Sequence, residues 1–71
     1  MDGLSDLIAA ARAELAQENP QRAQALLMPV LSEHPSNAPL LVALAEILTD
    51  LDRPAEALAT YHRILTFAPN N

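Results

Sequence analysis

Residues 38–71 read APLLVALAEILTDLDRPAEALATYHRILTFAPNN, and the pattern of this stretch occurs twice in the chain. When the sequence is compared with itself at an offset of 34 residues, the stretch aligns with residues 4–37, LSDLIAAARAELAQENPQRAQALLMPVLSEHPSN. A composition this rich in alanine and leucine would give roughly three or four identities by chance. Nine are found: Leu7 and Leu41, Ala9 and Ala43, Ala11 and Ala45, Pro20 and Pro54, Ala23 and Ala57, Ala25 and Ala59, Leu31 and Leu65, Pro35 and Pro69, and Asn37 and Asn71.

Each repeat divides at its internal proline into two segments. In all four segments of the chain, apolar residues recur at three- and four-residue spacings, which is typical of amphipathic helices. We therefore predict one all-α domain over residues 1–71, with repeat one at 4–37 and repeat two at 38–71. The expected buried faces are Leu4, Leu7, Ile8, Ala11 and Leu15; Ala23, Leu26, Leu27, Val30 and Leu31; Leu40, Leu41, Leu44, Ile47, Leu48 and Leu51; and Ala57, Leu58, Tyr61, Ile64 and Leu65.

Proline and capping residues predict where the helices begin and end. Proline suits the first turn of a helix because its missing N–H has no intrahelical partner there, and asparagine is a good N-cap. Pro29 instead falls inside the second segment and removes a backbone hydrogen bond, so we expect a kink or a distorted last turn. The expected boundaries are residues 4–17, Asn19 with Pro20, Asn37 with Pro39, Pro54 after a cap at Asp52 or Arg53, and Pro69 at the end of the fourth helix.

Length and charge exclude several classes of partner. A chain of 71 residues has a small core, and with no cysteine it needs close helix packing, self-association or a longer parent chain for further burial. The formal charge is −5, and four arginines are its only Lys or Arg cations, so nucleic acid and anionic membranes would be repelled. The sequence shows neither a signal peptide nor a membrane-spanning apolar run, so we expect a cytoplasmic protein.

The polar residues do not predict a reaction centre. His34 and His62 lack a second ligand at helical spacing, so we interpret both as surface residues and expect no metal site. The acidic pairs, Glu14 with Glu18 and Glu46 with Asp50, are better explained as solvated helix faces than as catalytic carboxylates. We therefore expect no catalytic residues, no cofactor and no small-molecule substrate, and we regard an enzyme as the least favoured hypothesis.

The repeat resembles the tetratricopeptide repeat family, whose 34-residue units are helix-turn-helix pairs that stack into a solenoid. Repeat two is the better match: Leu44, Ala57 and Tyr61 stand where the family has leucine, a small residue and an aromatic residue, and Pro69-Asn70-Asn71 resembles its closing turn. The resemblance implies a short solenoid of four helices, although an unrelated pair of helical hairpins remains an alternative. The chain departs from the family pattern at Leu7 and Leu41 (tryptophan), Ala11 and Ala45 (glycine), Glu18 and Asp52 (the inter-helix glycine), and Glu14 (a large apolar residue).

The resemblance also implies a binding surface, because the first helix of each unit lines a concave groove that holds a peptide or a partner helix. Ile8, Arg12 and Ala43 replace the lysines and asparagines with which some members clamp a C-terminal carboxylate, so that mode is not expected. With Arg12 on one unit and Glu46 and Asp50 on the other, the groove suits an amphipathic helix with a basic flank. Alternatively, Ile8 and Val42 only complete the packing within each pair. The groove residues are Ser5, Ile8, Ala9, Arg12, Leu15 and Ala16, followed by Pro39, Val42, Ala43, Glu46, Thr49 and Asp50.

Two hypotheses from different classes follow. In the first, the chain is a non-catalytic interaction module or scaffold for a protein or peptide partner, and part of a longer chain or complex. In the second, it self-assembles as a homodimer through the apolar face of its last helix, because no polar capping helix follows. The residues expected on that face are Leu58, Ile64, Leu65 and Phe67.

Overall fold

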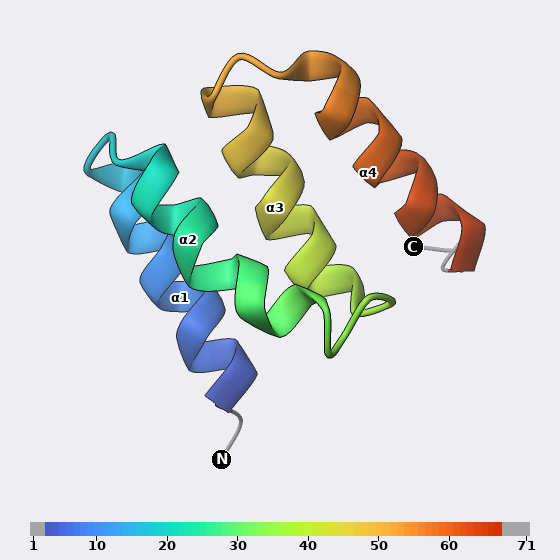
Figure 1. Cartoon of the computed structure of the whole chain (residues 1–71), viewed down its shortest axis with the longest axis horizontal. Helices are drawn as coiled ribbons and strands as arrows, with labels where there is room; N and C mark the ends of the chain where they lie inside the picture. Colours follow the sequence, from blue (N-terminus) through green and yellow to red (C-terminus); the bar gives the residue numbers. More distant parts are fainter. Residues whose placement is uncertain (1–2, 68–71) are drawn as a thin grey trace.

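The computed structural model describes residues 3–67, apart from the side chain of Phe67. It contains four α-helices, which are α1 (Gly3–Ala16), α2 (Pro20–Leu31), α3 (Ala38–Asp50) and α4 (Pro54–Phe67). Successive helices run antiparallel, and α3 lies between the α1–α2 pair and α4 (Figure 1). The described residues form no strand, so the predicted all-α class is confirmed. The predicted ending at Pro69 and the closing turn Pro69-Asn70-Asn71 lie outside the described residues.

The turns inside the two helix pairs are built alike. Glu18 and Asp52, which are 34 residues apart, both adopt the left-handed conformation, with φ of 63° and 61°. In the first turn the Asn19 N–H donates to the Glu14 carbonyl (2.9 Å) and the Glu18 N–H to the Leu15 carbonyl (3.0 Å). This arrangement is a Schellman-type helix ending. The second turn repeats it, with bonds from Arg53 N–H to Leu48 O (2.9 Å) and from Asp52 N–H to Thr49 O (3.1 Å).

Helices α2, α3 and α4 begin at the predicted positions, but they differ in whether a side chain caps the N-terminus. The Asn37 side chain accepts a hydrogen bond from the Leu40 N–H at 3.0 Å and so caps α3. Asn19 precedes α2, yet its side chain makes no capping bond. Because the Ala57 N–H donates to the Arg53 carbonyl, Arg53 rather than Asp52 is the N-cap of α4, which begins at Pro54.

The segment between α2 and α3, residues 32–37, is longer than the turns inside the two helix pairs, and it contacts α4. Pro29 does not break α2, which continues to Leu31 with Pro29 on its exposed side. The Ser32 hydroxyl donates to the Pro29 carbonyl at 3.0 Å just beyond the end of the helix. Further on, Arg63 Nη2 donates to the Pro35 carbonyl at 3.0 Å, which connects α4 to this segment.

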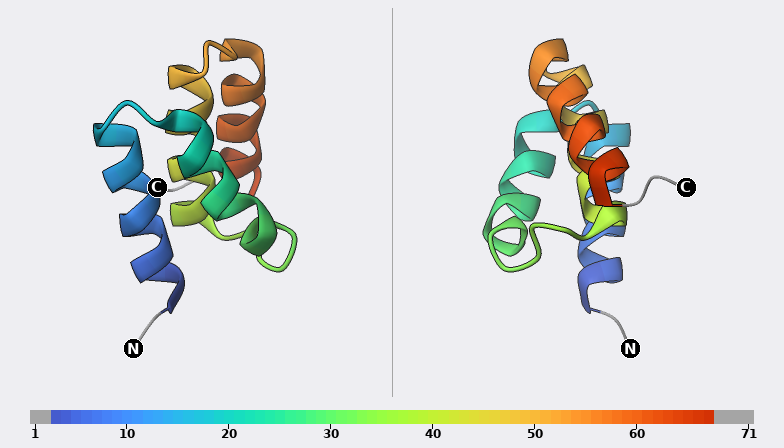
Figure 2. Two further views of the ribbon diagram at one scale, coloured as in Figure 1. Left: turned by 60° about the vertical axis from the view of Figure 1, so that its left-hand side comes forward. Right: turned by 90° about the vertical axis from the view of Figure 1, so that its right-hand side faces the viewer.

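The apolar core is centred on α3, the one described helix that packs against all the others. Figure 2 shows α2 lying to one side of α1 and α3. Helix α3 contacts both α1 and α2. Leu31 at the end of α2 contacts both clusters of buried residues and links the two helix pairs. One cluster joins α1, α2 and α3 through Ala11, Ala23, Leu27, Leu40, Ala43 and Ile47, and the other joins α3 and α4 through Leu41, Leu44, Leu48, Ala57 and Ile64.

The predicted buried face of α4 is wrong in part. Ala57, Thr60 and Ile64 are buried, whereas Leu58 and Leu65 are 60% and 54% exposed and Tyr61 is also exposed. The reason is that α4 packs against α3 alone, so only one side of its broad apolar surface is covered. Burial of Thr60 is compatible with its hydroxyl group, which donates to the Glu56 carbonyl at 2.8 Å.

Candidate partner-binding surface

The exposed sides of α1 and α3 carry residues at equivalent positions of the two repeats. On each helix these residues recur every three or four positions, so they form one row along the helix. The two helices are in contact, which places the rows side by side. We call this surface the α1–α3 face; it comprises Ser5 and Pro39, Ile8 and Val42, Arg12 and Glu46, and Ala16 and Asp50.

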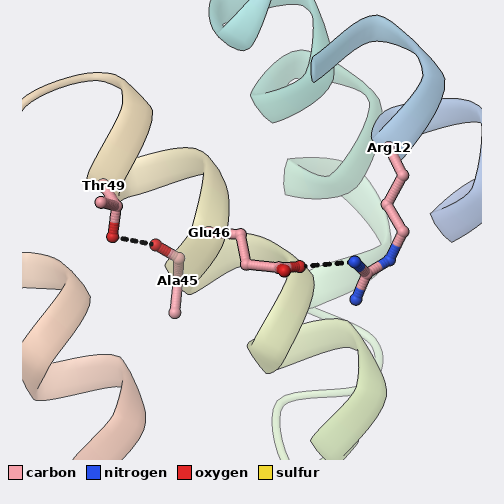
Figure 3. A network of polar contacts seen from close by, with 4 residues as sticks. All are labelled: Arg12, Ala45, Glu46 and Thr49. Atoms are coloured by element: carbon pink, nitrogen blue, oxygen red, sulfur yellow. Dashed lines mark hydrogen bonds and ion pairs between the residues drawn. The ribbon is translucent and has the colours of Figure 1, made fainter. Parts of the chain in front are cut away.

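An ion pair crosses the α1–α3 face. Arg12 Nη1 lies 2.7 Å from Glu46 Oε1, and Figure 3 shows the Glu46 side chain extending from α3 toward Arg12 of α1. The two side chains keep 47% and 39% of their surface exposed, so the pair contributes about 1 kcal/mol or less. Glu46 Oε1 itself is buried and has no hydrogen-bond partner in the described structure, so Arg12 supplies its compensating charge.

A hollow of about 310 Å³ opens at one end of the same face, beside the N-terminus of α3. Leu4, Ile8 and Pro39 supply its apolar walls, and polar atoms come from Ser5, Asn37 and Arg12. The capping bond of Asn37 orients that side chain and occupies the Leu40 N–H. Since Pro39 has no N–H, the start of α3 presents fewer free donors to this hollow than an uncapped helix would.

The predicted groove residues differ in accessibility. Ala9, Arg12, Ala16, Thr49 and Asp50 are exposed. Ser5 and Pro39 are exposed as well, and they line the hollow. Ile8, Leu15 and Val42 are half-buried and also pack against the core, so the packing alternative describes part of their role. The Thr49 hydroxyl donates to the Ala45 carbonyl at 2.9 Å, so its proton is directed into its own helix (Figure 3).

Two features of the predicted groove need revision. Ala43 is 1% exposed and belongs to the core cluster of α1, α2 and α3, so it cannot contact a partner directly. Its methyl group lies on the side of α3 that faces the first helix pair. Leu4 and Asn37, which line the hollow, were missed. Leu4 stands one helical turn before Ile8, so helical spacing was an available signal for it. Asn37 precedes α3 as its N-cap, and no spacing rule places it at the hollow.

The predicted self-association face also changes composition. Ile64 is 7% exposed and packs against α3, so it belongs to the core, and the side chain of Phe67 lies outside the described part of the chain. We call the exposed residues Leu58, Tyr61 and Leu65 the α4 stripe. Leu27 and Leu31 of α2 occupy the repeat positions that correspond to Tyr61 and Leu65, and both pack in the core beside α3. On α4 the same positions have no following helix among the described residues to pack against.

The described residues provide no group of three or more His, Cys, Asp or Glu side chains that could hold a metal ion. His34 and His62 are both exposed. Among the helices that the structure describes, none has the length and apolar character needed to cross a membrane.

Comparison with known proteins identifies a family. The sequence model of the family described as tetratricopeptide repeat matches residues 14–71, which extend from the end of α1 through α4. Neither the curated proteins nor the solved structures contain a match. The matched residues are most of the chain and include both Schellman turns. The chain therefore belongs to the tetratricopeptide repeat family.

Proposed function

We propose that this protein is a non-catalytic, cytoplasmic protein–protein interaction module of two repeats, residues 4–37 and 38–71, which binds a partner helix or peptide on the α1–α3 face. The observation that carries this proposal is the pairing of an apolar hollow with a charged row on the exposed side of two adjacent helices. Such a surface offers shape and charge for recognition, as helix-binding grooves do.

The charges of the described residues favour a basic partner. Each of the four arginines already contacts an oxygen of the chain: Arg12 that of Glu46, Arg22 that of Glu14 at 3.8 Å, Arg53 that of Glu56 at 3.7 Å, and Arg63 that of Pro35. The carboxylates in excess include Asp50 on the α1–α3 face, which is exposed. A partner with lysine or arginine on one flank would therefore be attracted, and an acidic partner repelled.

Two matched alanine positions on α1 test the location of binding. Ala9 belongs to the predicted groove and borders the α1–α3 face, one helical turn after Ser5. Ala10 lies about 100° further round the helix, and both alanines are exposed. Helical peptides selected on the full chain should bind the Ala9→Arg variant at least about tenfold more weakly, because the substitution adds bulk and positive charge to the binding surface. The Ala10→Arg variant should bind them normally. Equal effects of the two variants would contradict the proposal.

The α4 stripe favours a second candidate function, a homodimer in which two copies cover each other's α4. Leu58 and Leu65 are the most exposed large apolar residues of the described chain, and covering them would remove apolar surface from water. Sedimentation equilibrium of the unmodified protein should then report twice the monomer mass at high concentration. The Leu65→Glu variant should be monomeric and the Ala59→Glu control, on another side of α4, dimeric. A monomeric unmodified protein would exclude this function.

A further inference from the structure

We propose that the α1–α3 face recognises two features of one partner helix: an apolar side chain that fills the hollow, and a basic side chain seven or eleven residues away that meets Glu46 and Asp50. This inference rests on the proposed function and specifies the partner. It concerns the pattern of residues that the surface selects, whichever protein carries that pattern.

The hollow accepts an apolar anchor in preference to an anion. Its walls are Leu4, Ile8 and Pro39, and its volume of about 310 Å³ is sufficient for a leucine or phenylalanine side chain. The cation at the hollow, Arg12, is already paired with Glu46, so a carboxylate placed there would have to compete with Glu46 for it. The backbone at the start of α3 offers little else, because Asn37 occupies the Leu40 N–H and Pro39 has no N–H. Aromatic side chains that fill a pocket and exclude water from it are among the strongest interface anchors, so an aromatic residue suits this hollow best.

The other end of the face selects a cation. Glu46 and Asp50 are one helical turn apart and bring two carboxylates to a row where Arg12 is the single cation. An acidic partner group would compete for Arg12 and leave the buried Glu46 Oε1 without the cation that compensates it. A lysine or arginine can instead approach the exposed remainder of the Glu46 side chain and Asp50 while the existing ion pair stays in place.

The spacing follows from the geometry of α3. Pro39 lies at the hollow, and Glu46 and Asp50 stand seven and eleven residues later in the same helix, which corresponds to about 10 and 16 Å along its axis. A partner helix lying along α3 covers these distances with the same seven or eleven residues. An extended peptide would need only about three to five. The number of residues between anchor and cation therefore distinguishes a bound helix from a bound strand.

Selection from a displayed library tests the proposal. The library consists of alanine-rich 18-residue peptides in which one apolar position is retained and arginine is placed at each other position in turn. It is selected on the full 71-residue chain, and selected peptides are measured by fluorescence anisotropy. We expect enrichment of arginine at seven and eleven residues from the apolar position, on one side of it for a parallel helix and on the other for an antiparallel one.

Two variants, each with a matched control, then assign the contacts. Ser5→Trp fills the hollow and should weaken binding by about tenfold or more, whereas Ala10→Trp on another side of α1 should not. Asp50→Asn should weaken binding of the arginine peptide by about two- to fivefold but leave its arginine-to-alanine version unchanged. The exposed Asp52 in the turn after α3 supplies the matched control, Asp52→Asn, which should change neither peptide.

The outcomes separate this inference from the proposed function. Enrichment at three to five residues, or binding that is sensitive to Ala9→Arg but indifferent to Ser5→Trp and Asp50→Asn, overturns the two-point pattern and leaves the proposed binding surface intact. If no peptide is enriched, or if the selected peptides lose binding only with Leu65→Glu in the α4 stripe, the proposed function itself is refuted.

Discussion

Replacing Glu18 by glycine should stabilise the protein, although the substitution removes a side chain. Glu18 occupies the left-handed region with φ of 63°, where the Cβ of an L-residue crowds the following carbonyl oxygen, and its side chain is exposed. Glycine adopts this conformation without strain and keeps the backbone bonds of the turn. The equivalent Asp52, with φ of 61°, provides an internal comparison in the second repeat.

The magnitude is the difference between two opposing effects. The left-handed conformation costs an ordinary L-residue about 1–2 kcal/mol, and the greater freedom of glycine in the unfolded chain offsets about 0.5–1 kcal/mol of that. Glu18→Gly should therefore raise the free energy of unfolding by about 0.5–1 kcal/mol, or Tm by roughly 2–8 °C in a domain of this size. Asp52→Gly should gain less, because aspartate tolerates the left-handed region better than glutamate.

Urea denaturation followed by circular dichroism at 222 nm measures these differences. Glu18→Ala is the matched control, because it removes the same charge at the end of α1 but retains the Cβ atom. Its free energy of unfolding should rise clearly less than that of the Glu18→Gly variant. If Glu18→Gly lowers the free energy of unfolding, or if Glu18→Ala raises it equally, then the positive φ of Glu18 does not strain the backbone. A larger gain at Asp52 than at Glu18 would refute the ranking of the two turns.

Three further predictions concern the core, the helix caps and the ion pair. Leu27→Ala should cost about 2–5 kcal/mol in urea unfolding, because Leu27 is fully buried among three helices. Asn37→Ala should cost about 1 kcal/mol and Asn19→Ala markedly less, since only Asn37 makes a side-chain capping bond; equal costs in thermal unfolding would contradict this. A double-mutant cycle of Arg12→Ala and Glu46→Ala should give a coupling energy of about 0.2–1 kcal/mol. This energy should decrease between about 0.05 and 1 M NaCl, because the Debye length shortens roughly four- to fivefold, to about 3 Å; a salt-independent value would argue against an ion pair.

Much of the fold was predictable because local signals agreed with the 34-residue repeat. Proline at positions 20 and 54, and asparagine at position 37, marked the helix starts correctly, and the densely apolar residues 38–51 became the central helix. Glu18 and Asp52 were identified as standing in place of a glycine, and both adopt the backbone conformation that glycine favours. These features depend on neighbouring residues within one helix or one turn, so they can be recognised without tertiary information.

The candidate site was predicted less completely, because helical spacing identifies a face without showing what lies against it. Arg12 and Glu46 occupy equivalent repeat positions, yet only the approach of α1 to α3 turned opposite charges into an ion pair. Ala43 shares the spacing of the groove residues but is covered by the first helix pair. The hollow includes Leu4 and Asn37, which come from different helix ends and meet only in the folded chain.

The amino-acid sequence by itself determined four helices, the first residues of α2, α3 and α4, and the arrangement of the helices as two like pairs, because hydrophobic period, proline and capping are properties of short segments. The first helix spans Gly3–Ala16 instead of the expected residues 4–17. Tertiary structure alone decided that Ile64 would be buried while Leu58 and Leu65 stay exposed. All three residues are apolar, and Ile64 lies about 100–120° round the helix from Leu58 and Leu65. Apolar character therefore does not reveal which of the two sides is covered. Their difference arises because a helix with a single neighbour, α3, can bury only the side that faces it.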